Sequence, residues 1–209
     1  MKTILFLGLE PPQKKENETW ICYPVITIAP ASSANADIIN ALTILSKCSF
    51  LIFTSKTAVD LFFALKPDQK SLENKRWIAV GTATAKRLHE KKIDDAYTAK
   101  EETAEGVVAL IDALNIPQGT LFLWPHSARA RRVIPNALNA RGFSLTECIL
   151  YDTLVQTPSP KPDLTTIDEI FFTSPSTIEG FLLAYGTLPK DKKLRAIGPV
   201  TAAALRNLA

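Results

Sequence analysis

Two short groups of serine and threonine residues each occur twice in the chain. The tripeptide Phe-Thr-Ser at 53–55 returns at 172–174, and in both places an apolar and an acidic residue follow four and five positions after the serine. The heptapeptide AVGTATA at 79–85 returns as AIGPVTA at 196–202, at nearly the same separation. Two coincidences at one spacing indicate an internal repeat, so the sequence predicts two units of one ancestry.

The chemistry that these groups could perform is anion binding. Each follows an apolar run and precedes a segment of helical periodicity, which places hydroxyls and backbone N–H groups at the positive end of a helix dipole. Gly81 and Gly198 permit tight turns, and Thr84 and Thr201 then lie in the first helical turn. In open parallel sheets ligands bind beyond the carboxyl ends of the strands, where all four groups are expected. The alternative is plain capping, because serine and threonine cap most helices.

A third candidate anion site lies in a stretch without acidic residues, 113–146. Four arginines fall within it: Arg129, Arg131, Arg132 and Arg141. They predict a local positive patch in a chain whose net charge is only +3, and guanidinium groups bind carboxylate or phosphate in pairs of hydrogen bonds. The alternative is a solvated helix face whose arginines pair with acids distant in the sequence.

Few side chains in the sequence could act as an acid, a base or a nucleophile. His126 is the only histidine that we consider for ligand contact, and Tyr151 ends an apolar run where its phenol could face a cleft, although it could equally be a half-buried aromatic. The sequence contains no nucleophile elbow, phosphate-binding glycine loop or metal-spaced cluster. Its three cysteines are far apart, so buried thiols are favoured over a disulfide or a zinc site.

The elements that must position these residues alternate along the chain. Short runs rich in β-branched and aromatic residues predict strands at 2–8, 20–28, 50–54, 76–81, 119–124, 144–151, 168–173 and 194–198. Apolar spacings of three and four predict helices at 36–47, 56–65, 82–91, 104–114, 128–140, 175–185 and 199–208. This alternation is typical of an α/β protein with parallel sheets.

Proline-rich segments suggest where the chain divides. Residues 156–166 carry three prolines without apolar periodicity and predict a semi-rigid linker, and a second boundary is expected near residues 30–33. The polar stretch 10–19 predicts a loop in place of a helix between the first two strands. If both boundaries hold, the middle of the chain forms one unit and the two ends combine into the other.

Composition excludes several classes of protein. With 46% hydrophobic and 22% charged residues the 209-residue chain is neither disordered, collagen-like nor disulfide-scaffolded. The balance of 24 basic against 21 acidic residues gives no argument for nucleic acid or membrane partners. We find no secretory signal and no apolar run of membrane-spanning length, and we therefore expect a cytoplasmic protein.

The ordered set of motifs resembles uroporphyrinogen-III synthase. A strand ending in FTS, then AVGTATA, the arginine-bearing turn, a strand ending in ILYDT, FTSPS and AIGPVTAAAL follow one another over about residues 50–208. The resemblance implies two doubly wound, flavodoxin-like lobes joined by a two-stranded linker, with the ligand cleft between them. It places residues 1–28 and 154–209 in the first lobe, reduced to about four strands, and 31–152 in the second. A lobe with so little cover is expected to be mobile or shielded by a partner chain.

The resemblance also implies a reaction. The family closes hydroxymethylbilane, a linear tetrapyrrole bearing acetate and propionate on every ring, to uroporphyrinogen III with inversion of the last ring and loss of water. Tyr151 corresponds to a cleft tyrosine that assists departure of the hydroxyl. The implied substrate contacts, together with two candidates from the acid-free stretch, are Thr54, Ser55, Lys56, Thr82, Ala83, Thr84, His126, Arg129, Ser174, Pro175, Ser176, Gly198 and Thr201.

Two other kinds of protein remain as alternatives. A two-lobed binding protein for an anionic small molecule would need the same cleft, and a doubly wound signalling module would need a carboxylate cluster at a strand end that the sequence lacks. We expect neither a cofactor nor a metal, no partner besides the small-molecule polycarboxylate, and a monomer.

Overall fold

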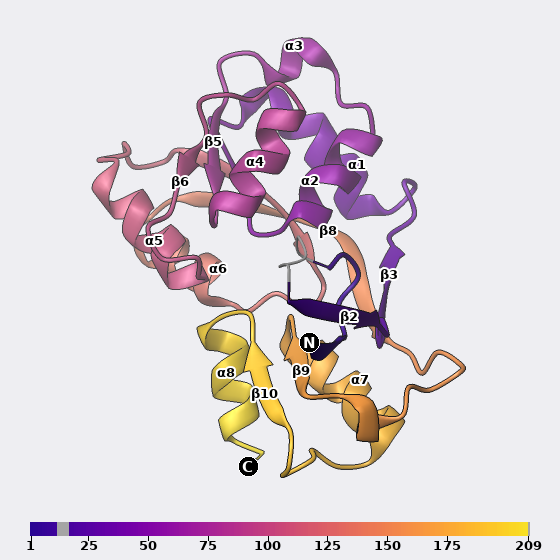
Figure 1. Ribbon diagram of the computed structural model, residues 1–209. Coiled ribbons are helices and arrows are strands. Elements are labelled where there is room, and N and C mark those ends of the chain that lie inside the picture. Colours follow the sequence, from indigo (N-terminus) through magenta and orange to yellow (C-terminus); the bar gives the residue numbers. More distant parts are fainter. Residues whose placement is uncertain (12–16, 209) are drawn as a thin grey trace. The chain divides into compact units, whose positions relative to one another are not determined.

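The computed structural model describes residues 1–11 and 17–208, and the central part of the predicted loop 10–19 therefore lies outside the described residues. The chain divides into two compact units, which are described separately (Figure 1). Unit 1 comprises Met1–Ala29 and Thr153–Ala209, and unit 2 comprises Pro30–Asp152.

Unit 2 is built on a parallel sheet with the strand order β8-β7-β4-β5-β6. The strands are β4 (Phe50–Phe53), β5 (Arg76–Ala79), β6 (Tyr97–Thr98), β7 (Leu121–Ser127) and β8 (Ser144–Val155). A further strand, β3 (Ile26–Pro30), borders β8 in the same sheet. The last residues of β8 and most of β3 are counted with unit 1. The predicted two-stranded linker between the units stays a prediction.

Helices cover both faces of this sheet. They are α1 (Ala36–Ile44), α2 (Lys56–Ala64), α3 (Gln69–Leu72), α4 (Thr82–Glu90), α5 (Ala104–Ala113) and α6 (Val133–Ala140), with a short 3-10 helix η1 (Leu45–Lys47). One face packs Phe50 and Trp124 against α5 and α6. On the other face Phe53 contacts Phe62 of α2 and Trp77 of β5, because successive side chains of a strand point to opposite faces.

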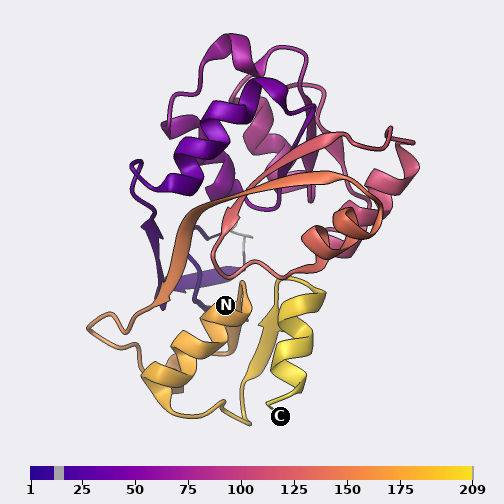
Figure 2. The same cartoon turned by 180° about the vertical axis from the view of Figure 1, so that it is seen from behind.

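Unit 1 is smaller. Its described residues form a four-stranded parallel sheet of order β10-β9-β1-β2, from β1 (Lys2–Phe6), β2 (Glu18–Cys22), β9 (Glu169–Phe172) and β10 (Lys193–Ala196). Two helices, α7 (Pro175–Tyr185) and α8 (Pro199–Arg206), contact each other and pack on the face that carries Leu5 and Phe172 (Figure 2). The 3-10 helix η2 (Leu164–Thr166) precedes β9.

The opposite face of the unit 1 sheet carries a separate aromatic cluster. Phe6, Trp20 and Phe171 lie with ring centroids 5.7–5.8 Å apart, and Ile4 completes the cluster. The guanidinium of Arg195 lies 4.3 Å from the centre of the Phe171 ring. Aromatic contacts of this kind add to the burial free energy, so a small sheet gains stability on the face that α7 and α8 do not use.

The two sheets share one winding plan. In unit 1 the spatial order β2-β1-β9-β10 corresponds to 2-1-3-4 when the strands are numbered along the chain. In unit 2 the strands follow one another along the chain as β4, β5, β6, β7 and β8, so the spatial order β6-β5-β4-β7-β8 is 3-2-1-4-5. A circular permutation that begins this unit at β7 gives 2-1-3-4-5, the flavodoxin-like order. The predicted class of doubly wound α/β sheets is confirmed, and β4 and β5 of unit 2 correspond to β9 and β10 of unit 1.

Several element boundaries differ from the predictions. The predicted strand 20–28 is two strands, β2 and β3, because the backbone leaves the first sheet around Pro24, which has no N–H to donate. The predicted helix 128–140 begins only at Val133, since β7 continues through Pro125 to Ser127. Strand β4 pairs with β7 only as far as Leu123, so the proline interrupts no ladder on that side.

The three cysteines differ in their exposure to solvent. Cys48 and Cys148 are buried as predicted, whereas the prediction is wrong for Cys22, which is exposed because β2 is an edge strand. None of the three thiols forms a disulfide.

Among the residues that the structure describes, no helix is both long and apolar enough to cross a bilayer.

Candidate functional site

Both Phe-Thr-Ser groups lie at the topological switch point of their own sheet. In unit 2 the group follows β4, beside β7, where the winding direction changes. In unit 1 it follows β9, beside β1, at the equivalent place. Ligands of open α/β sheets bind outside the carboxyl ends of the strands at such points. The fold therefore positions the two repeated groups where binding sites of this architecture occur.

The turn of unit 2 is shaped by Ser55, the N-cap of α2. Its backbone is extended, and its Oγ accepts a hydrogen bond of 3.0 Å from the backbone N–H of Ala58. The preceding residue, Thr54, accepts a long hydrogen bond of 3.4 Å from the indole N–H of Trp124 in β7. Thr54, Ser55 and Lys56 are all partly exposed at this edge of the sheet. The predicted capping role is therefore present, and it leaves the hydroxyl of Ser55 able to make a second contact.

That second contact is with Tyr151. The Ser55 Oγ and the Tyr151 phenol oxygen are 2.9 Å apart, and the side chains of Thr57 and Ser127 also hydrogen-bond to the phenol. A bulge between β7 and β8 at His126/Ser127 places Ser127 opposite Tyr151. The sequence analysis identified Tyr151 and Ser55 as separate candidate residues, and the structure places their side chains in contact.

The phenol of Tyr151 is held in its protonated form. The residue is only 6% exposed, and this burial raises the pKa of the phenol above its ordinary value, although the hydrogen bonds with Ser55, Thr57 and Ser127 act in the opposite direction. A buried neutral phenol remains a hydrogen-bond donor over a wide pH range. Tyr151 can therefore donate a proton or a hydrogen bond, and it is poorly suited to act as a base.

The side chain of His126 is buried near the carboxyl end of β7. Its ring is 5% exposed and stacks on Trp124 with the centroids 4.0 Å apart. Nδ1 lies 2.8 Å from the Ser127 carbonyl oxygen, and Nε2 lies 3.5 Å from a carboxylate oxygen of Glu147 without forming a hydrogen bond. Burial lowers the pKa of His126, so the ring is neutral near pH 7. Its contact with substrate stays a prediction.

The four arginines of the acid-free stretch are paired with acids from elsewhere in unit 2. Arg131 forms two hydrogen bonds with Glu105, and Arg141 forms two with Asp112. In the remaining ion pairs Arg129 lies 3.5 Å from Asp152, and Arg132 lies 2.5 Å from Glu147. The alternative that these arginines pair with distant acids is therefore what the structure shows, and the expected uncompensated positive patch is not present. Substrate binding by Arg129 stays a prediction.

In the Phe-Thr-Ser turn of unit 1, side-chain hydroxyls and backbone N–H groups of residues 173–177 hydrogen-bond to one another. The Oγ of Ser174 accepts from the N–H of Thr177, while the Oγ1 of Thr177 accepts from the N–H groups of Thr173 and Ser174. This reciprocal arrangement is a capping box. Pro175 at the first helical position has no N–H, and Ser176 is buried. Fewer backbone donors therefore remain available here than the sequence suggested.

The two glycine turns also differ. In α4 the carboxylate of Glu102 accepts a hydrogen bond of 2.8 Å from the N–H of Thr82, the first residue after Gly81. In α8 the corresponding first residue is Pro199, which has no N–H to donate. Thr82 and Ala83 are exposed, whereas the buried Thr84 and Thr201 face the interior of their units.

Three residues of the site were missed by the sequence reasoning. Thr57 and Ser127 complete the surroundings of the Tyr151 phenol, and Glu102 occupies the amino end of α4. Ser127 directly follows His126, so a search for hydroxyls at the ends of all predicted strands would have found it. Glu102 precedes the capping residue Thr103 of α5 by one position, and no sequence pattern connects it to Gly81.

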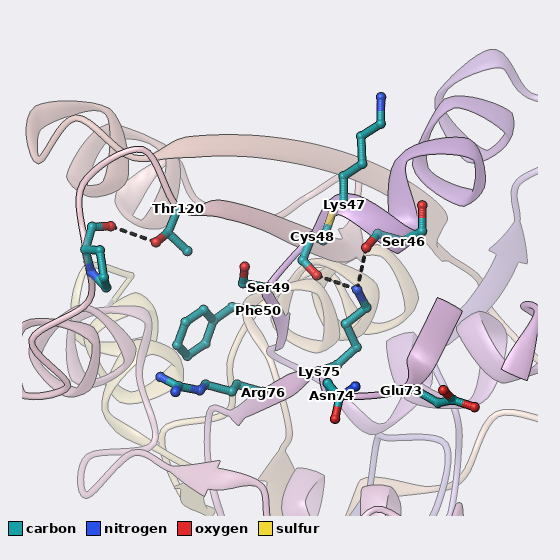
Figure 3. A pocket seen from close by; sticks show the side chains of 11 residues that line it. Ser46, Lys47, Cys48, Ser49, Phe50, Glu73, Asn74, Lys75, Arg76 and Thr120 are labelled. Carbon is teal, nitrogen blue, oxygen red and sulfur yellow. Dashed lines mark hydrogen bonds between the residues drawn. The ribbon is translucent and has the colours of Figure 1, made fainter. Parts of the chain in front are cut away.

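A recess of about 530 Å³ in unit 2 lies away from these turns. Lys75, Arg76 and Phe50 line it at the amino ends of β4 and β5, opposite the edge where the Phe-Thr-Ser turn lies (Figure 3). The ammonium of Lys75 donates to the carbonyl oxygens of Ser46 and Cys48 at 3.0 and 2.6 Å. Desolvation lowers the pKa of Lys75, although the neighbouring Cys48 acts in the opposite direction. The lysine thus fastens two segments together and takes no part in the chemistry of the turns.

No group of three or more potential metal-ligating side chains occurs among residues 1–11 and 17–208. The donors gathered at the turns are hydroxyls, backbone N–H groups and one phenol. Such a set suits the recognition of carboxylates and the donation of a proton.

Comparison with known proteins gives a consistent result. The family model described as uroporphyrinogen-III synthase HemD matches residues 13–209. A uroporphyrinogen-III synthase of Chlorobaculum parvum is 28% identical over 201 residues, which cover 90% of this chain and 79% of that protein.

Solved structures show the same fold. A crystal structure of a mutant uroporphyrinogen III synthase from the extremely thermophilic bacterium Thermus thermophilus matches with a TM-score of 0.66 and 19% identity, over 100% of this chain and 89% of that one. The uroporphyrinogen-III synthetase of Helicobacter pylori 26695 also gives 0.66 and 19%, over 99% and 89%. The alternative of a binding protein without catalysis is not favoured by these matches.

Proposed function

The chain belongs to the uroporphyrinogen-III synthase family, the cyclising lyases of haem biosynthesis, and from this premise we propose how its residues perform the reaction. The substrate class is a linear tetrapyrrole, and the reaction closes it with loss of water. What the family membership leaves open is which side chains act on the substrate.

The observation that carries the proposal is the 2.9 Å contact between Tyr151 and Ser55 at the switch point of unit 2. We assign Tyr151 the role of proton donor to the hydroxyl that leaves hydroxymethylbilane. The hydroxyl departs as water, and the proton that the attacking pyrrole ring loses after closure restores the phenol. The raised pKa of Tyr151 supports this role, because the phenol stays protonated until the leaving oxygen accepts from it.

The hydroxyls around the phenol orient it. The Oγ of Ser55 accepts a hydrogen bond from the backbone N–H of Ala58, and this bond fixes the side-chain rotamer of Ser55. The Tyr151 phenol is therefore oriented by a side chain that is itself ordered. A catalytic group gains effectiveness when it is positioned before the substrate arrives. Ser55, Thr57 and Ser127 are thus positioning residues for Tyr151.

The acidic side chains of the substrate require hydrogen-bond donors at several places. In unit 2 we propose that the turns at Thr54–Lys56 and Thr82–Thr84 bind substrate carboxylates, with Arg129 and the backbone around His126 beside them. In unit 1 we propose that the predicted contacts Ser174, Ser176, Gly198 and Thr201 also bind substrate carboxylates. Pro175, the fifth predicted contact, has no N–H and can contact the substrate only through its ring. We propose that the main task of the enzyme is to orient the substrate through such contacts. A difference of about 4 kcal/mol between the transition states of two modes of closure gives roughly a thousandfold preference, so a few contacts are enough to select one mode.

The test is the isomer distribution of the product. The protein is incubated with freshly prepared hydroxymethylbilane, the products are oxidised, and isomers III and I are separated. We expect isomer III from the wild type, and a rate of its formation lower by about 100-fold for Tyr151→Phe, within the range usual for loss of a general acid.

Tyr97→Phe is the matched control, because Tyr97 lies in the same unit on β6 and is exposed. It should retain the wild-type rate. Wild-type turnover by Tyr151→Phe would overturn the role of the phenol, and isomer I alone from the wild type would overturn the activity itself.

Two further proposals concern the cellular location and the oligomeric state of the enzyme. The free thiols of Cys22, Cys48 and Cys148 support a reducing, cytoplasmic location. We also propose that the enzyme acts as a monomer, which sedimentation at the assay concentration tests.

A further inference from the structure

We infer that His126 is a positioning residue for the reaction, and that it holds Ser127 against the Tyr151 phenol only while its ring is neutral and carries its proton on Nδ1. This inference rests on the proposed role of Tyr151 as proton donor. It adds a residue that acts through Ser127 and not on the leaving hydroxyl. It also predicts a lower limit to the pH range in which the enzyme is active.

The hydrogen bond of Nδ1 determines where the proton of the neutral ring lies. Nδ1 is 2.8 Å from the carbonyl oxygen of Ser127, and because a carbonyl oxygen only accepts, Nδ1 must carry the hydrogen. A neutral imidazole has one N–H group, so Nε2 is left with a lone pair. Nε2 of His126 is buried and has no hydrogen-bond partner among the residues that the structure describes. Both nitrogens therefore agree with a single tautomer.

The bond from Nδ1 acts on a residue that orients the phenol. A bulge in the pairing of β7 with β8 falls between His126 and Ser127 and places Ser127 opposite Tyr151. The side chain of Ser127 hydrogen-bonds to the Tyr151 phenol. The carbonyl oxygen of Ser127 also accepts a backbone hydrogen bond of 3.0 Å from Ala130, which closes the local turn. The imidazole adds a side-chain bond that ties this turn to the interior of unit 2.

The imidazole is itself fixed by packing. It stacks on the indole of Trp124 with an interplanar angle of 23°, and Trp124 is 2% exposed. The indole N–H of Trp124 in turn donates to Thr54 in the turn after β4. A ring that is buried and stacked in this way can hold its bonding partner in one place.

Protonation of Nε2 introduces a competing partner. Nε2 lies 3.5 Å from a carboxylate oxygen of Glu147, which is too long for a hydrogen bond and is the contact of two acceptors without a proton between them. The same oxygen is paired with Arg132. A proton on Nε2 creates a donor toward this carboxylate, and the ring must move toward Glu147 to use it. That movement lengthens the bond from Nδ1 to Ser127.

Two charged groups act on the pKa of His126 in opposite directions. Glu147 of β8 raises it, and Arg132, the N-cap of α6, lowers it; burial lowers it most, and the hydrogen bond to Ser127 raises it. We expect kcat to fall as the pH drops through the pKa of His126, and we call this fall the acid limit. Glu147→Gln should move the acid limit to lower pH, whereas Arg132→Gln should move it to higher pH.

The first test compares three substitutions of His126. In His126→Asn the amide nitrogen can take the place of Nδ1, in His126→Gln it takes the place of Nε2, and His126→Phe keeps an aromatic ring on Trp124 without a donor. For His126→Gln and His126→Phe we expect kcat for isomer III to fall about 3- to 10-fold with unchanged KM, as is usual for the loss of one hydrogen bond. His126→Asn should recover most of kcat and, because its side chain does not titrate, should lack the acid limit.

Two results of this comparison contradict the inference. An equal loss of kcat in all three variants would mean that only the packing of the imidazole matters. A raised KM with unchanged kcat would mean that His126 contacts the substrate directly. His89→Asn is the matched control, because His89 is the other histidine of the chain and its side chain is 73% exposed. It should keep the wild-type kcat, KM and acid limit.

A second measurement needs no turnover. NMR titration of the ring nitrogens of His126 gives both its tautomer and its pKa, and the backbone amide signal of Ser127 should shift at the same pKa. The acid limit should follow this pKa in the wild type, in Glu147→Gln and in Arg132→Gln. A proton on Nε2 of the neutral ring, or an acid limit that does not move with the pKa, would overturn the inference.

The double variant of His126→Phe with Tyr151→Phe separates the inference from the proposed function. If His126 acts through the phenol, His126→Phe should cause no further loss of kcat once the phenol is absent. A full further loss would overturn the inference and leave the role of Tyr151 intact. Wild-type turnover by Tyr151→Phe alone would overturn that role, and the inference with it.

Discussion

The two Phe-Thr-Ser turns have the same sequence and the same place in their sheets, yet their serines have different partners. In unit 2 Ser55 caps α2 and contacts Tyr151. In unit 1 Ser174 is engaged in a capping box with Thr177. The residue three positions after the serine decides between them, because Ala58 offers no hydroxyl where Thr177 has one. A repeated motif thus marks equivalent positions in the fold without marking equivalent roles.

The phenylalanines that begin the two turns test whether the units are equivalent as structures. Phe53 and Phe172 are both fully buried, and Phe53 contacts two aromatic rings whereas Phe172 contacts one. Phe53→Ala and Phe172→Ala should each lower the free energy of unfolding by about 3–5 kcal/mol, with the larger loss for Phe53→Ala. Urea unfolding followed by circular dichroism measures both.

Leucine variants at the same positions extend this test if an alanine variant fails to fold. Phe53→Leu and Phe172→Leu should keep the same order with smaller losses. A larger loss at Phe172 would mean that the four-stranded unit depends more strongly on its core than the better-covered one, contrary to the comparison of their aromatic contacts.

The serines test whether the turns differ in function. Ser55→Ala removes both a cap and a partner of the Tyr151 phenol, and we expect kcat for isomer III to fall about 10- to 100-fold, which is about 1.4–2.7 kcal/mol. Ser174→Ala removes a cap and a proposed substrate contact but no partner of the phenol, so stability should fall by about 1 kcal/mol and KM should rise, whereas kcat should change little. Steady-state kinetics and thermal unfolding of both variants separate the two effects.

A clear result would contradict this contrast. Equal loss of kcat in Ser55→Ala and Ser174→Ala would mean that the capping box of unit 1 opens during the reaction. Ser55→Thr keeps the hydroxyl and the capping ability, so it should recover part of the rate.

Sequence reasoning predicted the elements more successfully than the contacts between them. The alternation of apolar runs and helical periods indicated the order of strands and helices, and the repeats located the turns at the strand ends, because these features depend on neighbouring residues. The contact of Tyr151 with Ser55 joins residues 96 positions apart and depends on the bulge at Ser127. Nothing local to Tyr151 predicts it.

The same limit explains the arginines and Glu102. The stretch 113–146 lacks acids along the chain, but Glu105, Asp112 and Glu147 lie just outside it and approach through the packing of neighbouring elements. A local deficit of charge in the sequence therefore does not establish a deficit in space. Glu102 reaches α4 from the loop before α5, and only the three-dimensional arrangement shows that its carboxylate accepts a hydrogen bond from the N–H of Thr82.

Two carboxylates give the smallest contrast between the units. In unit 2 the hydrogen bonds from Arg131 hold the pKa of Glu105 at about 2, and its side chain is 54% exposed. In unit 1 burial alone would raise the pKa of Glu169, but hydrogen bonds from Lys2 and Lys193 outweigh this effect and leave its pKa below the ordinary value. Glu169 is 1% exposed. Both groups favour the folded state when ionised, but solvent and salt screen only the first.

The expected pH dependence follows from these shifts. A carboxyl whose pKa is lower in the folded state stabilises the protein fully above its unfolded pKa, near 4.5, and this stabilisation is lost as the pH falls toward its folded pKa. Between pH 6 and 3 the wild type should therefore lose more stability than either Glu105→Gln or Glu169→Gln. For the exposed pair of Glu105 and Arg131 the difference should be below about 1 kcal/mol and should shrink in ~0.5 M NaCl. The difference for Glu169 should persist in salt, because its carboxylate is shielded from solvent, and a difference that vanished at both positions would show that Glu169 is screened as well as Glu105.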